Sequence, residues 1–261
     1  MPGTSRIGVA ALLRGLSLAL TFSSIVHAQD SAPIVTDRPD VTEAANVVPR
    51  LSVQVENGLT WTVQDHQHTV SGTETLLRVG IGQRFELRVG VPDYFLNLSA
   101  GRHPDGFNDL SLGLKQQVGP VAGNIQLSII AATSLPSGTG GVSTHGIDPF
   151  LKVPWSKELQ PGWSIGGMQS IFWTTENGRR NPTGETTVYV EKKVVEPWAL
   201  FLEYAGDFAS LDRARQLLHI GMTYRIGLRH QVDAHVGFGL SAAAPNHFVA
   251  VGYSFRLHSA R

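Results

Sequence analysis

The feature that most constrains this chain is an alternation of apolar and polar residues that recurs along most of its length. In RFELRVGV at 84–91 the apolar residues take the odd positions and three charged residues take even ones. Between Leu218 and Ile226 the apolar residues take the even positions. Because successive side chains of a β-strand point to opposite faces, each such segment predicts a strand with one apolar and one polar face.

Twelve segments predict strands, and most have about the ~9–11 residues that a tilted strand needs to cross a membrane. They lie at residues 51–61, 73–81, 84–91, 108–118, 123–133, 148–156, 162–173, 185–194, 198–206, 215–226, 229–239 and 247–257. The sixth segment is weakened by Pro149 and Pro154. In the seventh, Gln169 interrupts the face that carries Trp163 and Trp173. We expect a β-bulge there, because an extra residue would restore the alternation.

Short and long connections alternate between these segments. The short ones lie at Gly82-Gln83, 119–122, 157–161, 195–197 and Gly227-Leu228, and the long ones at 62–72, 92–107, 134–147, 174–184, 207–214 and 240–246. Barrels of the bacterial outer membrane have short periplasmic turns and longer outer loops, whereas a β-sandwich has no reason to sort its loops. The sequence therefore predicts an all-β, transmembrane, up-and-down antiparallel β-barrel of about 12 strands, with both termini in the periplasm.

Aromatic residues and composition agree with a membrane barrel. Ten aromatic residues lie near predicted strand ends, as in the two aromatic belts of such barrels; they are Trp61, Trp173, Tyr204 and Phe238 at the outer ends and Phe85, Trp155, Trp163, Trp198, Tyr224 and Phe255 at the periplasmic ends. A soluble barrel with an aromatic core is the alternative. Charged residues make up only 16% of the chain and the mean hydropathy is −0.02, which fits neither an ordinary soluble domain nor a helical membrane protein. With no Cys and a formal net charge of zero, disulfide scaffolds, thiolate sites and nucleic-acid binding are not expected.

The first 28 residues have the pattern of a cleaved export signal. A basic start with Arg6 and Arg14 leads into an apolar run from Leu16, and Val26-His27-Ala28 forms a small-x-small cleavage site. The alternative is an inner-membrane anchor helix, but the run is short for ~30 Å of hydrocarbon. We therefore expect a signal peptide at 1–28, an N-terminal segment at 29–50, a barrel at 51–257 and a tail at 258–261.

If the apolar face contacts lipid, the polar face lines a lumen. The predicted lumen-lining residues are Arg78, Arg84, Glu86, Arg88, Asp109, Lys115, Lys152, Glu203, Arg225, Asp233 and His235, with Glu56, Glu74, Asp148, Glu191 and Lys193 on the same face. Acids and bases nearly balance, so strong anion or cation selectivity is not expected. Because twelve strands lie between the eight that leave room only for side chains and the sixteen that leave a channel, a restricted passage and a plugged interior both stay open.

The segment at 29–50 is not strand-like and contains the motif TDRPDVTE at 36–43. The charged residues of this motif are Asp37, Arg38, Asp40 and Glu43, with Pro39 between them. Composition favours a flexible periplasmic tail. The alternative is a constriction, in which the segment folds into the lumen and pairs with charges of the wall.

This motif resembles the start of a bacterial outer-membrane transporter family described as "Putative MetA-pathway of phenol degradation". Further similar stretches are FNDLSLGLK at 107–115 and TSLPSG at 133–138, and the resemblance covers roughly residues 36–257. It implies an outer-membrane barrel linked to the uptake of aromatic or other small organic compounds. Such barrels usually finish on an aromatic residue, whereas here Arg256–Arg261 follow Phe255.

Catalytic, phosphate and metal motifs are weak. Ser143 and His145 share one loop but lack a clear third partner, and no Gly-x-Ser-x-Gly or His-Glu-x-x-His motif is present. His66 and His68 with Asp65 offer a metal site only if their loop folds suitably, and a solvated loop is favoured. Asp233 and His235 fit a hydrogen bond in the wall better than an acid–base pair. We expect no catalytic residue, metal or cofactor.

The favoured function is passive uptake of small organic, possibly aromatic, solutes through the outer membrane of a Gram-negative bacterium. The alternatives are an outer-membrane lipid hydrolase and a closed structural or adhesive barrel. The expected partners are outer-membrane lipid, the solute and the barrel assembly machinery, with no nucleic acid.

Overall fold

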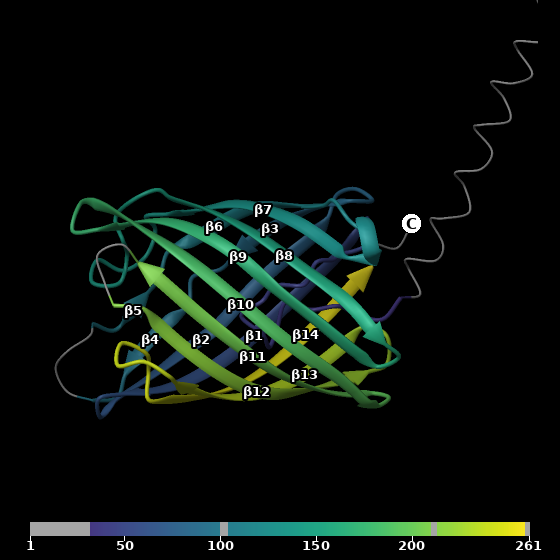
Figure 1. Ribbon diagram of the computed structural model, residues 1–261. Coiled ribbons are helices and arrows are strands. Elements are labelled where there is room, and N and C mark those ends of the chain that lie inside the picture. The colour runs from purple at the N-terminus through teal and green to yellow at the C-terminus, as the bar shows by residue number, and fades with distance from the viewer. Residues whose placement is uncertain (1–31, 100–103, 210–212, 259–261) are drawn as a thin grey trace, which may run out of the picture. The chain divides into compact units, whose positions relative to one another are not determined.

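The computed structural model of the chain describes residues 32–99, 104–209 and 213–258, and Figure 1 shows their arrangement. The elements are β1 (Ser52–Gln64), β2 (Gln67–Gly80), β3 (Phe85–Gly90), β4 (Tyr94–Asn97), β5 (Gly106–Phe107), β6 (Leu110–Gln117), the 3-10 helix η1 (Ala122–Asn124), β7 (Gln126–Leu135), β8 (Asp148–Gln160), β9 (Trp163–Glu176), β10 (Arg179–Val195), β11 (Trp198–Ala209), β12 (Arg215–Ile226), β13 (His230–Gly239) and β14 (His247–His258). Within these ranges, no helix is long and apolar enough to span a membrane.

The strands form one closed antiparallel sheet. Most strands pair with their sequence neighbours, β3 pairs with β2 and β6, β4 pairs with β2 and β5, and β1 closes the ring by pairing with both β2 and β14. β3 with β4, and β5 with β6, each continue along one line of the wall, so the ring has twelve wall strands. Closure gives every wall strand a neighbour on each side, which a sheet in lipid requires because no water is there to satisfy a free edge. The predicted fold class is confirmed.

Two long outer connections of the sequence-based prediction are wrong. β1 and β2 continue to a two-residue turn at Asp65-His66, and β9 and β10 continue to a two-residue turn at Asn177-Gly178. All four turn residues have positive φ, as in the type I′ turns that close β-hairpins. The alternation fades in 62–72 and 174–184 because strand ends beyond the apolar band have no lipid to face. Part of 92–107 also forms strand, as β4 and β5.

The two faces of the wall differ as the alternation predicts. Along β11, Leu200 and Leu202 are exposed, whereas Phe201 and Glu203, which alternate with them, are buried. The exposed apolar residues cover the outer face of the ring, and charged residues such as Glu86 and Lys115 point inward and are buried. The lipid-facing band and the polar interior therefore both result from side chains that alternate between the two faces of each strand.

The bulge expected at Gln169 does not occur. β9 keeps an unbroken register with β10 through this position, with Gln169 opposite Thr186. Gln169 stays on the exposed face, and its Oε1 accepts a 2.9 Å hydrogen bond from the Thr186 hydroxyl. One side-chain hydrogen bond thus replaces the backbone irregularity that the interrupted pattern indicated.

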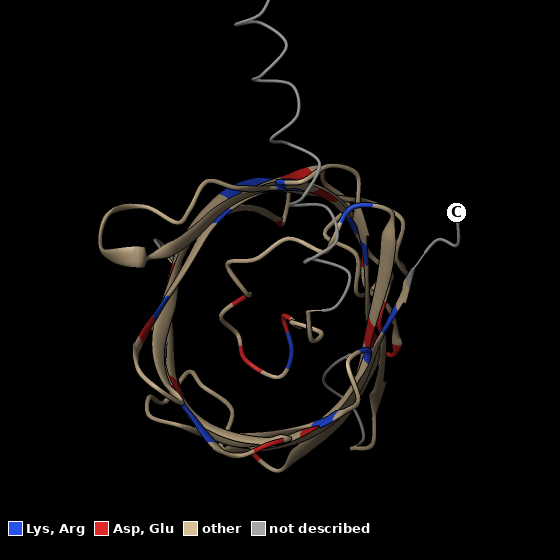
Figure 2. Cartoon of the chain, turned by 90° about the vertical axis from the view of Figure 1, so that its right-hand side faces the viewer, with Lys and Arg blue, Asp and Glu red and all other residues tan. Residues whose placement is uncertain are grey.

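Residues 34–50 do not form a periplasmic tail, so the favoured expectation for this segment is wrong. Figure 2 looks along the barrel and shows the segment looping inside the ring of strands. Ile34 and Val48 are almost completely buried, and the backbone N–H of Ile34 donates to the carbonyl of Leu228 in the β12–β13 turn. The predicted signal peptide at 1–28, with Arg6, Arg14 and the cleavage site, lies outside the described residues. Residues 259–261 of the predicted tail lie outside them as well. His258, also assigned to that tail, ends β14.

We expect substitution to arginine to separate the lipid-facing surface from the water-facing ends. Ile220 on β12 and Leu228 in the following turn are equally exposed, at 50% each. Near the middle of a bilayer an outward arginine costs about 2–4 kcal/mol, and near an interface about 0–1 kcal/mol. Ile220→Arg should therefore lower the free energy of unfolding in lipid vesicles far more than Leu228→Arg. Equal small effects in a denaturant titration would contradict the assignment of the apolar face to lipid.

Candidate functional site

The candidate site is the lumen where residues 34–50 cross it, and its centre is the carboxylate of Asp37. Three wall cations surround this carboxylate: Arg88 Nη1 at 2.7 Å, Arg78 Nη1 at 3.2 Å and Lys115 Nζ at 3.4 Å. They come from three neighbouring wall strands, β3, β2 and β6. Asp37 also accepts a 2.9 Å hydrogen bond from the N–H of Ala44, which folds the segment back on itself.

Wall carboxylates hold the backbone of the same segment. Glu56 on β1 accepts hydrogen bonds from the N–H groups of Asp37, at 2.9 Å, and Arg38, at 3.1 Å. Its other oxygen accepts from Arg78 at 2.9 Å. Further along, the N–H of Val48 donates to Glu86 at 2.7 Å. Buried backbone groups without strand partners therefore find them on the wall, as burial requires.

Arg38, the next residue, is anchored on β2 and β13. Its guanidinium pairs with Glu74 at 2.5 Å and with Asp233 at 3.3 Å. It occupies space left by Gly58 and Gly252, which lie opposite each other on β1 and β14. A Cβ at either position would overlap the guanidinium. Because Gly58 and Gly252 have no side chain, they leave the space that the Arg38 guanidinium fills.

Thr42 and its neighbour reach the far wall. Glu203 on β11 accepts hydrogen bonds from the N–H groups of Val41 and Thr42, both at 2.8 Å, and from the Thr42 hydroxyl at 2.5 Å. The Thr42 hydroxyl also contacts that of Thr187 on β10. Since Asp37 is held by β2, β3 and β6, the segment spans the lumen from one wall to the other.

Glu43 fixes the segment to a third part of the wall. Its carboxylate lies 2.7 Å from Arg88 Nη2 on β3 and 2.7 Å from Lys152 Nζ on β8. Lys152 Nζ also lies 5.6 Å from the ring centres of Phe150 and Phe172. Together with Thr42, this contact ties the segment to both sides of the lumen and makes it a constriction.

Asp37 and Asp40 of the segment have opposite electrostatic surroundings. Burial alone would raise the pKa of Asp37, but Arg78, Lys115 and Arg88 together outweigh burial and hold that pKa well below its usual range. For Asp40, burial raises the pKa, and the carboxylates of Glu203 and Glu191 raise it further. The charge of Asp37 is therefore stabilised in the folded barrel, and the charge of Asp40 is not.

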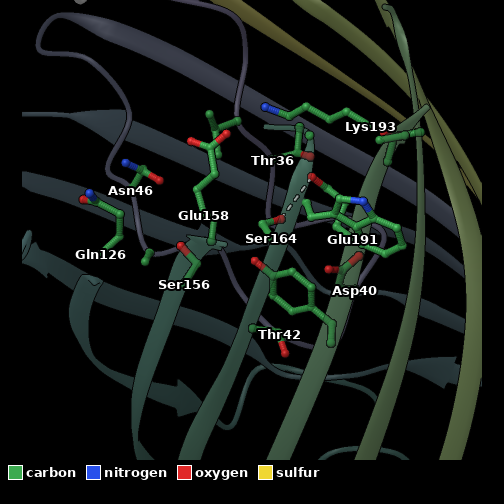
Figure 3. Close-up of a pocket in the computed structure, with 18 of the residues that line it drawn as sticks. Thr36, Asp40, Thr42, Asn46, Gln126, Ser156, Glu158, Ser164, Glu191 and Lys193 are labelled. Carbon is green, nitrogen blue, oxygen red and sulfur yellow. Dashed lines mark hydrogen bonds between the residues drawn. The ribbon is translucent and has the colours of Figure 1, made fainter. Parts of the chain in front are cut away.

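A cavity of about 790 Å³ lies between this segment and the wall at the periplasmic mouth. Its wall side comes from η1, β7–β13 and the turns between them, and its other side from the segment. In Figure 3, Asp40 lies close to Glu191, whose carboxylate accepts a hydrogen bond from Ser164. Tyr189 and Arg225 also line the cavity. Acidic, basic and aromatic groups thus share one water-accessible space.

Most of the predicted lumen residues lie together around the segment. The structure places Arg78, Glu86, Arg88, Lys115, Lys152, Glu203, Asp233 and His235 on the inward face. Arg225 lies at the periplasmic mouth, paired with Glu196. Asp109 lies just before β6 and accepts hydrogen bonds from the N–H groups of Ser137, Gly138 and Thr144 in an outer loop.

The placement of Arg84 in the lumen is wrong. Arg84 is exposed in the β2–β3 turn, where its guanidinium donates to the carbonyl of Val118. The alternation places it on the inward face, but the strand begins only at Phe85, so that face does not extend to it.

The sequence-based prediction of the lumen rests on charged residues and does not include the inward residues Phe201, His219 and Phe248. With the predicted His235 they form a cluster of rings on β11–β14, with centre-to-centre distances of 5.4–6.4 Å. His219 Nε2 lies 3.2 Å from Glu203, the residue that holds Thr42. The alternation of β12 could have identified His219 as an inward residue, because it shares the odd-numbered, polar face of the strand with Arg225.

The weaker candidate sites do not assemble. The Ser143 hydroxyl accepts from the backbone N–H of His145, whereas the His145 ring contacts the carbonyl of Gly140. The ring of His68 stacks on Trp61 at 5.6 Å. Within the described ranges, no three His, Asp or Glu side chains are grouped to hold a metal.

Comparisons with known proteins agree with this architecture. The family model described as "Putative MetA-pathway of phenol degradation" matches residues 36–257. An outer membrane channel from Pseudomonas putida F1 is 14% identical, with a TM-score of 0.63 over 84% of this chain and 99% of that chain. The KdgM porin is 11% identical, with a TM-score of 0.52 over 79% of this chain and 99% of that chain. No curated protein sequence matches the chain.

At these identities the structural likeness shows the fold, which is that of outer-membrane channels. The family match confirms the resemblance that TDRPDVTE indicates. The barrel is therefore an outer-membrane barrel, and its lumen holds the candidate site.

We expect Gly252→Ala to loosen the segment, because the new Cβ would displace the Arg38 guanidinium. Hydrogen exchange followed by mass spectrometry should show faster exchange of the peptide at 34–50. Gly184→Ala on β10 is the matched control, since a Cβ there meets nothing within 4 Å. Equal exchange in the two variants would contradict the role of the glycine pair.

We expect opposite effects from removing the charges of Asp37 and Asp40. Asp37→Asn should lower the free energy of unfolding at pH 7 by about 3–5 kcal/mol, as when one partner of a buried ion pair is removed. Asp40→Asn should raise it, because the variant lacks a destabilised charge. Denaturant titrations check both effects.

The pH dependence of these two effects follows from the directions of the pKa shifts. The stabilisation by Asp37 should be present above the ordinary carboxyl pKa and lost as the pH falls through its lowered value. The gain in Asp40→Asn should shrink as the pH falls through the raised pKa of Asp40. Destabilisation by both variants at pH 7 would contradict the assigned surroundings.

Proposed function

This chain belongs to the family described as "Putative MetA-pathway of phenol degradation", and from that premise we propose that it is a passive outer-membrane channel for small organic solutes. Diffusion through the lumen would need no cofactor. Residues 34–50 would set the width of the passage, because they reach from the Asp37 contacts on one wall to Glu203 on the other.

The observation that carries this proposal is the cavity beside the segment. At about 790 Å³ it lies within the ~300–1,000 Å³ typical of small-molecule sites. The network of ion pairs lies mainly on the side of β1, β2, β3 and β6, while the cavity lies along β7–β13. The segment crosses the lumen but has most of its ion pairs on one side, and the space for a solute lies beside it along the other side.

The charges around the cavity support a preference for neutral or weakly charged solutes. Acidic Asp40 and Glu191 are countered by basic Lys193 and Arg225 on neighbouring positions of the lining. A lining of mixed sign gives no strong field for one kind of ion. Tyr189 adds an aromatic surface, which suits the aromatic solutes that the family description suggests.

The cellular part of the proposal is export through a cleaved signal at 1–28, followed by insertion into outer-membrane lipid by the barrel assembly machinery. The apolar outer band supports insertion into lipid. The enzyme alternative lacks support, because the hydroxyl of Ser143 and the ring of His145 are not hydrogen-bonded to each other as a nucleophile and base would be. The density of contacts across the lumen favours a closed structural barrel as the second candidate.

Deletion of residues 36–48 should raise the single-channel conductance in planar bilayers several-fold, because it removes the constriction while β1–β14 keep their register. Thr42→Ala tests the same idea with a smaller change, since it removes only the hydroxyl contacts to Thr187 and Glu203. Ser143→Ala is the matched control in the outer loop and should leave the conductance unchanged.

Liposomes that contain the unaltered protein should swell in solutions of neutral aromatic compounds and of sugars, and the same protein should conduct ions in planar bilayers. If neither the protein nor the deletion variant conducts or admits solute, the barrel is closed and the proposal is wrong. Hydrolysis of phospholipid that disappears in Ser143→Ala would instead support the enzyme.

A further inference from the structure

One glutamine lies on the lipid-facing side of the wall, near the middle of the apolar band. Gln169 is exposed and shares the outward face of β9 with Trp163 and Trp173, the aromatic residues at the two ends of that face. It follows Trp163 by six residues and precedes Trp173 by four. With a rise of ~3.3 Å per residue and a tilt of ~40°, it lies roughly 15 Å from the first and 10 Å from the second along the membrane normal. The amide group is therefore surrounded by hydrocarbon.

The protein satisfies only half of this amide. Gln169 Oε1 accepts a 2.9 Å hydrogen bond from the Thr186 hydroxyl, but within the part of the chain that the structure describes no hydrogen bond includes its Nε2. Asn57, on the outward face of β1, is a contrast. Its Nδ2 donates to the carbonyl of Tyr253 at 3.4 Å, and its Oδ1 accepts from Thr75 at 3.0 Å. Gln169 is thus a lipid-facing amide that still needs an acceptor for its N–H groups.

The depth of Gln169 limits what this acceptor can be. Acyl chains offer no acceptor and water is absent, so an unpaired N–H in the hydrocarbon is costly. A glutamine side chain is too short to reach either headgroup region from this depth. The acceptor that fits is therefore a polar group of another protein in the same membrane.

A second copy of this chain carries such a group at the right depth. All copies insert in the same direction, so a two-fold axis along the membrane normal brings a residue of the wall to the level of its own counterpart. An amide is both donor and acceptor, and its carbonyl oxygen has two lone pairs. In Gln169 the Thr186 hydroxyl uses one lone pair, which leaves the other for an N–H of the second copy.

The surface beside Gln169 allows a close approach. On β10, Gly184 lies between Ile171 of β9 and Phe208 of β11, and a Cβ at Gly184 would meet nothing within 4 Å. Small residues of this kind let membrane-embedded elements pack closely. Val188, on the same face of β10, is apolar and 40% exposed. A polar centre with low and apolar surroundings is thus available for contact with a second barrel.

We propose that two copies of the barrel associate in the membrane through the outward faces of β9 and β10. Each Gln169 donates an amide N–H to the Oε1 of its counterpart, so the contact is two-fold symmetric and satisfies both amides. This goes beyond passage of a solute through the lumen and does not depend on it, because the contact lies on the opposite face of the wall.

Energy transfer between labelled copies in phospholipid vesicles tests the proposal. The chain contains no cysteine, so Arg179→Cys, at the exposed start of β10 beside the β9–β10 turn, accepts a single fluorophore. Donor-labelled and acceptor-labelled proteins are mixed at increasing protein-to-lipid ratios. We expect transfer that saturates as a dimer does, together with twice the mass of one chain in native mass spectrometry. Transfer no greater than that of randomly placed barrels would overturn the proposal.

Gln169→Leu should weaken the association about tenfold, because leucine suits lipid but neither donates nor accepts a hydrogen bond. Gly184→Trp should block it, because the ring fills the low surface. Leu59→Trp on β1 is the matched control, since Leu59 is 53% exposed and lies on the opposite side of the ring. Equal effects of Gly184→Trp and Leu59→Trp would contradict an interface at β9 and β10.

The folded state of each variant is checked by its mobility in SDS gels before and after heating. A folded Gln169→Leu variant that associates as strongly as the unaltered protein would overturn the proposal. Purified protein that stays monomeric and associates only with a different outer-membrane protein would overturn it as well. Loss of association in folded Gln169→Leu and Gly184→Trp, with association retained in Leu59→Trp, supports it.

Discussion

The structure depends on a constraint that the bilayer imposes on the backbone. Where no water is present, each N–H and C=O must find its partner within the protein, and a sheet meets this demand only by closing on itself. Closure fixes two surfaces at once, because alternate side chains then face either lipid or an enclosed interior. The outward leucines of β11 and the buried Glu203 next to Leu202 are two results of the same geometry.

An enclosed interior creates a second problem, which residues 34–50 help to solve. Inward cations such as Arg78 and Lys115 are removed from bulk water and need counter-charges, because an unpaired buried charge is costly. Asp37 supplies a shared counter-charge to three wall strands. The segment is held by the same ion pairs that it neutralises, so its position and the balance of charge in the wall depend on each other. Asp40, with acidic neighbours and exposure to the cavity, lies outside this balance.

The fold was largely predictable from the sequence, because lipid selects a simple pattern. All twelve segments became wall strands, and the face of each followed from its apolar residues. The prediction failed where lipid no longer selects: at the turns Asp65-His66 and Asn177-Gly178, and at Arg84. The position of residues 34–50 was not predictable, because it depends on pairs such as Asp37 with Arg78 that are 41 residues apart. Neutral partners such as Thr187 carry no charge that would identify them in the sequence. Their place in the alternation, however, assigns them to the inward face.

The central claim is that the segment crosses the lumen in the outer membrane itself. Thr42 and Thr187 have their hydroxyl groups in contact, and the chain contains no cysteine. A Thr42→Cys, Thr187→Cys double variant should therefore form an intramolecular disulfide in growing cells, visible as a mass two hydrogens below that of the reduced protein in freshly isolated membranes. Two free thiols, both modified by a maleimide added to the periplasm, would contradict the account.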